Sequence, residues 1–298
     1  MQLWIIFMTE ELVTVYIPTH NRNVLVERAI KSVLAQTYKN LEIIICDDGS
    51  SDSTWEVLTR LKKNDERIKL LRNTIPKGAC VSRNNCIRIA KGKYITGLDD
   101  DDEFLPERIE KFIGFINNNT YQLVCSNLFY KSDGFMSKGE RYSGVISKKM
   151  IGYRNMIGNQ IFSETCLIKD IGGFDEKAPA WQDYDLWFRL LSRGYECYRI
   201  DDATYIMDIA HDAPRITTSS KAYLGYQYFV TKHRDVLSNF QLNSLYLEDK
   251  TNRGEYVSFV DVITNPCKHG CQEYLKNKVK KYFPVIKRIV DEKKKVKL

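Results

Sequence analysis

The sequence predicts an α/β protein built on a mostly parallel β-sheet with flanking helices. Two observations support this class. The first 130 residues alternate short apolar, β-branched segments with amphipathic segments at helical spacing. Clusters of acidic residues follow two of the expected strands, at the edge where open α/β sheets bind ligands. The chain has 298 residues, of which 43% are hydrophobic, and this composition excludes a disordered or fibrous protein.

The expected strands are apolar runs that stop at turn-forming residues. Pro18 closes the first run, because proline has no N–H to donate to a neighbouring strand. The second run is largely apolar, which is typical of a parallel strand that is buried on both faces. Strands are therefore expected at 12–17, 41–46, 68–71, 93–98, 121–129 and 165–168.

The expected helices carry apolar residues three and four positions apart. Ser53 and Glu56 have the spacing of a capping box, and Pro106 stands where a helix can begin. Residues 131–160 are polar and glycine-containing, and are expected to form an irregular loop. Helices are expected at 24–36, 53–63, 79–90, 106–116, 183–192 and 223–236, and from 273 to the end.

The net charge of +7 is concentrated in the basic tail, residues 276–298. This tail holds ten basic and two acidic residues, a local +8, so the other 275 residues sum to about −1. The body of the protein is therefore not expected to bind nucleic acid. The basic tail alternates apolar and cationic residues and is expected to lie on an anionic membrane surface, with a solvated terminus as the alternative.

The chain is expected to be cytoplasmic, at most peripheral on the inner face of the cytoplasmic membrane. No apolar run approaches the roughly 20 residues that a spanning helix needs. The apolar segment at 3–8 is short and lacks the flanks of a signal peptide, and Met8 is a plausible alternative start. The eight cysteines are accordingly expected to be reduced core thiols, and Cys267 and Cys271 do not have convincing zinc-site spacing.

Four aspartates and a glutamate, residues 99–103, follow the fourth expected strand. Like charges at this density repel one another, and a divalent cation relieves the repulsion. Hard oxygen ligands suit Mn²⁺ or Mg²⁺, often together with substrate phosphates. The alternative is a solvated acidic turn whose last residues favour the start of the next helix.

Six ordered segments carry a resemblance to a known family. They are Pro18–Arg22, Ser32–Thr37, Ile45–Thr54, Ser82–Asn84, Leu98–Asp102 with Pro106, and Gln182–Arg189. The chain strongly resembles family 2 glycosyltransferases from about residue 12 to residue 215. The resemblance implies a GT-A fold, a UDP-sugar donor, a divalent cation and inversion at the anomeric carbon. It also implies a catalytic domain at 1–220, with a nucleotide-binding half at about 12–105 and an acceptor-binding half at about 106–220, followed by a helical extension with the basic tail at 221–298.

The finer resemblance is to enzymes of O-antigen synthesis. Gly97–Phe104 and Gln182–Trp187 look most like those of transferases that add galactose or glucose in β-1,3 linkage to N-acetylglucosamine on a polyprenyl diphosphate. A UDP-hexose donor and a lipid-linked or oligosaccharide acceptor would then be the substrates.

The resemblance assigns expected roles to individual residues. The nucleotide sugar would be bound by Pro18, Thr19, Asp48, Arg83, Asp99 and Asp100, and the metal by Asp101 and His211. Asp48 would accept a hydrogen bond from the uracil imide, a donor that cytosine lacks, and Asp47 is the weaker candidate. The extra aspartate at position 100 leaves open whether Asp99 or Asp100 faces the ribose.

Asp183 is the expected catalytic base, which would take the proton from the attacking hydroxyl. The alternative is that Asp183 only caps the helix that follows, since aspartate is a favoured N-cap residue. Trp181 and Tyr184 are candidates for an aromatic platform under the acceptor, whereas Trp187 and Phe188 are expected in the core. Asp185 and Arg189 are expected to form a surface pair.

Two other functions remain open from the sequence. A nucleotidyltransferase would share the sheet and the acidic metal site, but it should begin with a glycine-rich phosphate loop, and Pro18–Arg22 contains no glycine. A non-catalytic protein that binds a membrane or a polyanion would account for the basic tail alone.

Overall fold

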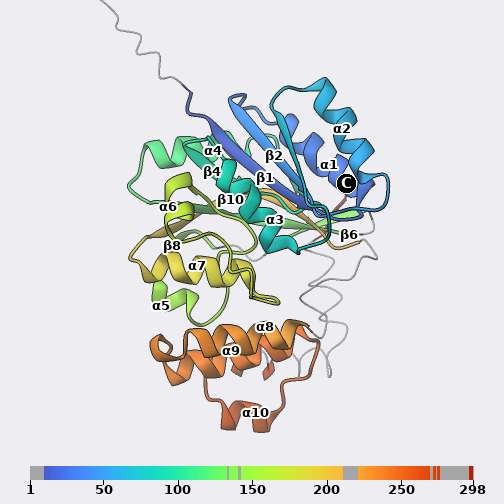
Figure 1. Ribbon diagram of the computed structural model, residues 1–298. Coiled ribbons are helices and arrows are strands. Elements are labelled where there is room, and N and C mark those ends of the chain that lie inside the picture. Colours follow the sequence, from blue (N-terminus) through green and yellow to red (C-terminus); the bar gives the residue numbers. More distant parts are fainter. Residues whose placement is uncertain are drawn as a thin grey trace, which may run out of the picture.

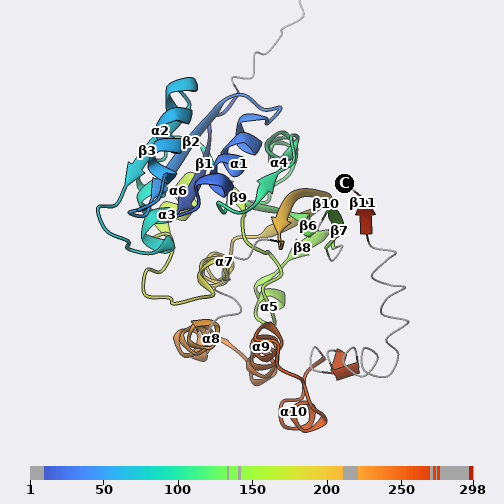
Figure 2. The same ribbon diagram turned by 90° about the vertical axis from the view of Figure 1, so that its right-hand side faces the viewer.

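The protein is a sheet with helices on both faces and a helical group at one end. The computed structural model describes residues 10–132, 134–139, 142–210, 221–268, 271–272, 274–275 and 295–297. In Figure 1 the sheet forms the upper part of the molecule, and α8, α9 and α10 lie below it, with α7 and α5 between. The second view shows the same arrangement (Figure 2).

The sheet mixes parallel and antiparallel pairs. Its strand order is β11-β7-β6-β9-β4-β1-β2-β3, with β10 beside β5, β6 and β8. The pairs among β4, β1, β2 and β3 are parallel, as is the pair of β6 with β10, whereas β9 runs antiparallel between β4 and β6. The strands are β1 Val13–Thr19, β2 Leu41–Asp47, β3 Ile68–Arg72, β4 Tyr94–Gly97, β5 Glu103–Phe104, β6 Leu123–Ser132, β7 Phe135–Lys138, β8 Gly144–Ile146, β9 Phe162–Glu164, β10 Cys197–Asp208 and β11 Lys295–Lys297.

Helices connect the strands and extend the chain beyond β10. The helices are α1 Asn23–Leu34, α2 Thr54–Asn64, α3 Ala79–Ile89, α4 Arg108–Asn117, α5 Lys148–Ile151, α6 Thr165–Asp170, α7 Gln182–Ser192, α8 Lys221–Lys232, α9 Asn239–Asn252 and α10 Phe259–Thr264, with a 3₁₀ turn at Arg234–Val236. Within the described residues, no helix is both long enough and apolar enough to cross a bilayer.

The sheet separates two hydrophobic cores. Ile43 and Ile45 of β2 pack in the core that α1, α2 and α4 cover, whereas Ile44 and Cys46 face the core under α3, α6 and α7. This alternation follows from the two-residue period of a strand. Because both faces are covered, β2 is buried at every residue, which is why its sequence is nearly continuous in apolar residues.

The parallel half of the sheet confirms the expected strands and helices to within a few residues, and two local expectations there are wrong. Pro18 lies inside β1, paired with Cys46 of β2. Proline is tolerated at this position because β1 pairs with β4 only as far as Tyr16, which lies opposite Gly97. The N–H that Pro18 lacks is therefore not needed for a hydrogen bond to β4. Ser53 is the N-cap residue of α2 but makes no side-chain hydrogen bond to the helix, and its hydroxyl instead accepts one from Asn23 Nδ2.

Three expectations further along the chain also differ from the structure. Residues 165–168, expected as a strand, form the start of helix α6, and the strand β9 precedes them. The loop expected at 131–160 contains β7, β8 and α5. Residues 295–297 form a strand beside β7, not the end of a helix. Cys46, Cys80, Cys86, Cys125 and Cys197 are buried thiols as expected, whereas Cys166, Cys267 and Cys271 are not buried.

A buried charge cluster joins α7 to α8. Asp185 is 1% exposed, so its pair with Arg189 is not the surface pair that the spacing predicted. His233 Nε2 and Lys232 Nζ each lie 2.8 Å from Asp185 Oδ1. Burial opposes the charge of Asp185, yet His233, Arg189 and Lys232 together hold its pKa well below the usual range. The C-terminal helices are thus anchored to the helix that carries Asp183.

Gly97 gives a test of how tightly the strand ends are packed under the acidic residues. A Cβ at Gly97 would overlap the Gln160 amide oxygen and the Tyr16 ring. Gly97→Ala is expected to lower the free energy of unfolding by about 1–3 kcal/mol, measured by urea denaturation. Gly114→Ala in α4 is the control, since a Cβ there meets open space and alanine favours the helix. Equal stability of the two variants would contradict the expected clash.

Candidate active site

A cleft of about 520 Å³ lies where β1, β2 and β4 end, and α7 and α9 contribute to its opposite wall. Parallel strands bring their carboxyl ends to one edge, so segments that are distant in sequence meet there. The cleft brings together most of the residues that the sequence singled out, namely Pro18, Thr19, Asp48, Arg83, Asp99, Asp100, Asp101, Trp181, Asp183 and Tyr184. His211, the second expected metal ligand, lies outside the described residues.

Asp48 follows β2 directly and is held by donors from the next crossover. Its Oδ1 accepts hydrogen bonds from Asn73 Nδ2 at 2.7 Å and from the Lys77 N–H at 2.8 Å, and its Oδ2 accepts one from the Gly78 N–H at 2.7 Å. Burial favours the protonated form, but these donors outweigh it and keep the pKa of Asp48 below its usual value. Asp48 is thus a fixed, ionised acceptor in the cleft wall.

Asp47 points away from this wall. It is fully buried, its Oδ1 accepts from the Ser50 N–H, and its Oδ2 lies 3.1 Å from Arg72 Nε. Asp47 is not among the residues that line the cleft, whereas Asp48 is. Of the two aspartates, only Asp48 is placed to meet a ligand in the cleft.

Arg22 bridges two carboxylates of the acidic cluster, a contact that sequence reasoning missed. Its Nη1 lies 2.8 Å from Asp100 Oδ1 and 2.7 Å from Asp101 Oδ2. Burial raises the pKa of Asp100 to about 6, with Arg22 acting against this shift and Asp101 adding to it. The only signal in the sequence was the place of Arg22 in the segment Pro18–Arg22.

The acidic cluster at residues 99–103 is partly buried, so it is not the solvated turn that the sequence left open as an alternative to a cation site. Asp100 is 7% exposed and Asp102 is 2% exposed. Asp102 accepts hydrogen bonds from the Tyr205 hydroxyl at 2.7 Å and from the Asp208 N–H at 3.0 Å, so it ties the cluster to β10. Of the two aspartates that pair with Arg22, Asp101 is the more accessible. Its side chain is 20% exposed, whereas that of Asp100 is 10% exposed.

Asp99 and Arg83 form a pair in the middle of the cleft. Arg83 Nη2 donates to Asp99 Oδ1 at 2.9 Å, and Asp99 also accepts from the amides of Asn159 and Gln160. Arg83 is 7% exposed, and its Nε and Nη1 have no partner among the described residues. Buried donors without partners carry a free-energy cost, which an anionic ligand in the cleft would offset.

Asp183 lies in the first turn of α7 and faces the pair of Arg83 and Asp99. Helix α7 begins at Gln182 with Trp181 as the N-cap residue, so Asp183 does not occupy the capping position that was its alternative role. Its Oδ1 is buried and has no partner among the described residues. Burial raises the pKa of Asp183 to about 7, with Arg83 lowering it and Asp99 raising it. A carboxylate with this pKa is suited to accept a proton near neutral pH.

The two aromatic residues beside Asp183 differ in burial. Tyr184 is 4% exposed, its hydroxyl donates to the Ile151 carbonyl, and its ring stacks on Phe229 at 4.4 Å. Trp181 is only partly buried and has the left-handed backbone conformation, with φ of 60°. Trp181 is therefore the more accessible candidate for an acceptor platform. Trp187 and Phe188 are core residues, each 1% exposed, as expected.

The donor set of the cleft fits a divalent cation. The carboxylates along the cleft are Asp48, Asp99, Asp100, Asp101, Asp102, Asp183, Asp208 and Glu248, and the arginines are Arg22 and Arg83. In the described part of the chain, no three acidic, histidine or cysteine side chains form a preformed metal cage. A cation here would therefore take one or two carboxylates plus ligand phosphates, as Mg²⁺ and Mn²⁺ commonly do.

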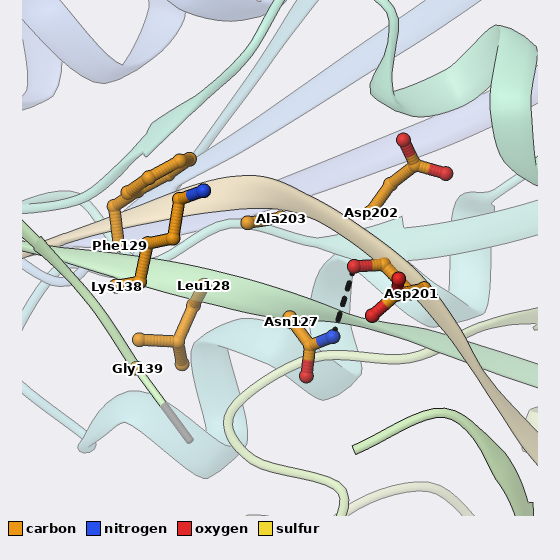
Figure 3. Close-up of a pocket in the computed structure, with 8 residues that line it drawn as sticks. All are labelled: Asn127, Leu128, Phe129, Lys138, Gly139, Asp201, Asp202 and Ala203. Carbon is orange, nitrogen blue, oxygen red and sulfur yellow. Dashed lines mark hydrogen bonds between the residues drawn. The ribbon is translucent and has the colours of Figure 1, made fainter. Parts of the chain in front are cut away.

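A second hollow, of about 290 Å³, lies over β6 and β10 (Figure 3). It sits where the register of β10 against β6 shifts between Ile200 and Ala203. Asn127 Nδ2 donates to the Asp201 carbonyl at 3.0 Å there, and Asp202 pairs with Lys111. The described residues that the sequence singled out for the site line the other cleft, and none of them lines this hollow.

Comparisons with known proteins identify the family of the chain. The family described as "Glycosyl transferase family 2" matches residues 14–171. The chain is 39% identical over 251 residues to the "Putative colanic acid biosynthesis glycosyl transferase WcaA" of Escherichia coli K12, covering 79% of this chain and 87% of that protein. It is 35% identical over 190 residues to the E. coli "UDP-Glc:alpha-D-GlcNAc-diphosphoundecaprenol beta-1,3-glucosyltransferase WfaP". This match covers 62% of this chain and 72% of WfaP.

A solved structure shows the same fold. The Pyrobaculum calidifontis mannosyltransferase PcManGT, solved with GDP-Man and Mn²⁺, superposes with a TM-score of 0.64. The match covers 93% of this chain and 82% of that one at 16% sequence identity. The fold is thus shared although the sequences have diverged widely.

Proposed function

The chain belongs to glycosyltransferase family 2 and has the GT-A fold, and we propose that it transfers a hexose from a UDP-sugar to a lipid-linked sugar with inversion. The observation that carries this proposal is Asp183, a carboxylate with a pKa of about 7 that faces a cleft containing an ionised acceptor and a partly unpaired arginine. Glucose or galactose is the proposed sugar, and surface polysaccharide assembly is the proposed process. The name of WfaP, a UDP-glucose-dependent relative, supports the donor.

The donor binds at the end of the cleft formed by β1, β2 and β4. Pro18 and Thr19 lie beside the nucleobase, and Asp48 accepts the hydrogen bond that the uracil imide N–H donates. Arg83 directs its unpaired N–H groups to the diphosphate, while Asp99 and Asp100 face the ribose. All six of these residues line the cleft.

Transfer is a single displacement at the anomeric carbon. The carboxylate of Asp183 takes the proton from the attacking acceptor hydroxyl, whose oxygen forms the new bond to the sugar C1. The bond from C1 to the diphosphate oxygen breaks, and its electron pair leaves with UDP. Because attack and departure occur on opposite faces, the configuration at C1 inverts.

A divalent cation, Mn²⁺ or Mg²⁺, would be held by Asp101 with the donor diphosphate. When bound, it would compensate the negative charge that develops on the departing diphosphate. In the structure Arg22 forms ion pairs with both Asp101 and Asp100, and its single positive charge offsets part of their mutual repulsion. PcManGT, which shares the fold, was solved with Mn²⁺, and this supports a divalent cation as the cofactor.

The acceptor is proposed to be N-acetylglucosamine on a polyprenyl diphosphate, as the name of WfaP states for that relative. An acceptor of this kind is confined to a membrane. The sequence of the basic tail, with its local +8, suits the anionic headgroups of a cytoplasmic leaflet. We therefore propose that the enzyme works peripherally on that surface, with residues 1–220 as the catalytic domain and 221–298 as the extension.

The pKa of Asp183 predicts the pH dependence of the reaction. Its raised pKa means that Asp183 is protonated below about pH 7 and cannot take a proton there. The kcat/KM is expected to rise as the pH increases through about 7 and then to level off, since the base form is complete above that value. Rates measured from about pH 5 to about pH 9 test this. A profile that falls over the same range would contradict the assignment.

The proposed function is tested by UDP release from a panel of UDP-hexoses, with and without Mn²⁺. The acceptor is a synthetic N-acetylglucosamine diphosphate lipid. Metal-dependent turnover with one donor is the expected result. Binding of UDP without turnover would overturn the acceptor, and failure to bind any nucleotide would overturn the transferase itself.

A further inference from the structure

The cleft continues past Asp183 to helix α9, which lies beyond the region that the family match covers. Glu248 and Asn252 of α9 line the cleft together with Trp181 of the turn before α7. The two α9 residues are four positions apart and therefore lie on one face of the helix. The family match ends at residue 171, so it assigns no role to Glu248 or Asn252.

The order of groups along the cleft limits what this wall can bind. The residues proposed to hold the nucleotide come from β1, β2, α3 and the acidic cluster, all on the sheet side. In an inverting displacement the acceptor must approach from the side of the base, opposite the departing diphosphate. Asp183 is on α7, which lies between the sheet and α9 (Figures 1 and 2). The wall formed by α9 is therefore on the acceptor side of the base.

We propose that Glu248 and Asn252, with the indole of Trp181, form the subsite that binds the acceptor sugar. This inference rests on the proposed function and deepens it. A carboxylate accepts hydrogen bonds from sugar hydroxyl or acetamido N–H groups, and an asparagine amide both donates and accepts them. An indole offers an apolar face to the C–H groups of a sugar ring. The subsite thus recognises the sugar ring of the acceptor, and the carboxylate of Glu248 disfavours a phosphate at the same place.

The wall is held rigidly against the cleft. Ser238 and Gln241 form a capping box at the start of α9, and Gln241 Nε2 also donates to the Lys149 carbonyl of α5. Leu245 and Leu247 are fully buried in the same helix. A subsite on a packed helix needs little reorganisation on binding, which favours selective recognition.

Trp181 has a left-handed backbone conformation, which asparagine or glycine adopts more easily than tryptophan. The left-handed backbone of a tryptophan is strained, and surrounding packing must maintain it. Phe229 and Tyr226 of α8 hold its ring, with centroids 5.7 Å away in both cases. Helices α8 and α9 therefore supply both the support for the indole and the polar partners beside it.

The test compares Glu248→Gln and Asn252→Ala with Asn239→Ala, a control on the same helix. Asn252 and Asn239 are both exposed, so neither substitution removes core packing, and Asn239 does not line the cleft. The KM for the synthetic N-acetylglucosamine diphosphate lipid is expected to rise about tenfold in Glu248→Gln and about fivefold in Asn252→Ala, as expected for loss of single hydrogen bonds. The Kd of UDP with Mn²⁺, measured by calorimetry, should stay within about twofold of the wild type in all three variants.

Three results would overturn the inference. The first is an acceptor KM in both variants that equals that of Asn239→Ala. The second is a rise in the UDP Kd that matches the rise in acceptor KM, because α9 would then act on the donor end. The third is a lower acceptor KM in Glu248→Gln, which would place the acceptor diphosphate at Glu248. A wild-type enzyme that binds UDP but transfers no sugar to this lipid would instead overturn the proposed acceptor, and one that binds no nucleotide would overturn the proposed transferase.

Discussion

Asp183→Asn is expected to lower kcat by about a thousandfold and to leave the Kd of UDP nearly unchanged. Asparagine has the shape of aspartate but cannot accept the proton of the attacking hydroxyl at neutral pH. The side chain lies in the wall of the cleft, facing the pair of Arg83 and Asp99. Single-turnover sugar transfer and calorimetry with UDP measure the two quantities separately.

Two controls separate proton transfer from a general effect on the fold. Asp202→Asn removes an exposed carboxylate outside the cleft, whose contact is an ion pair with Lys111, and should leave kcat unchanged. The residual activity of Asp183→Asn should also lose the rise with pH through about 7. A variant that keeps more than about a tenth of wild-type kcat would show that another group is the base.

The fold could be predicted where a local pattern decides the structure. The parallel strands β1 and β2 are buried at every residue, so their sequences are largely apolar. The prediction of a strand at 165–168 was wrong because a short apolar run fits a strand and a helix equally well. Its backbone is decided by tertiary contacts, such as the bond that the Thr165 N–H donates to the Lys93 carbonyl after β9.

The site could be predicted as far as ordered motifs reach. Asp48, Asp99 and Asp183 follow strands or begin a helix within recognisable segments, and the fold brings them into one cleft. The ion pair of Arg22 with Asp101 joins residues 79 positions apart, and no local sequence pattern predicts it. The wall formed by α9 was missed for the same reason. Helix α9 was not among the expected helices, and its polar residues could be linked to the site only once the fold had placed them near α7.

Asp101→Asn is expected to lower kcat/KM by about a hundredfold and to remove the effect of Mn²⁺ on UDP binding. The substitution removes the charge of the proposed metal ligand, the more accessible of the two carboxylates that Arg22 contacts. It also removes a neighbour whose charge raises the pKa of Asp100, so Asp100 should ionise more readily in the variant. Calorimetry with UDP, with and without Mn²⁺, gives a readout that does not depend on turnover.

The opposing substitution distinguishes metal binding from simple charge balance. Arg22→Gln removes the cation that holds Asp100 and Asp101 together, and so leaves two carboxylates that repel each other. If a divalent cation takes the place of Arg22 in the working enzyme, this variant should bind Mn²⁺ more tightly, whereas Asp101→Asn should bind it more weakly. If the carboxylates only anchor Arg22, neither substitution changes the affinity for Mn²⁺, and both act through stability alone. Opposite shifts in the Kd of Mn²⁺ would therefore assign Asp101 to the metal.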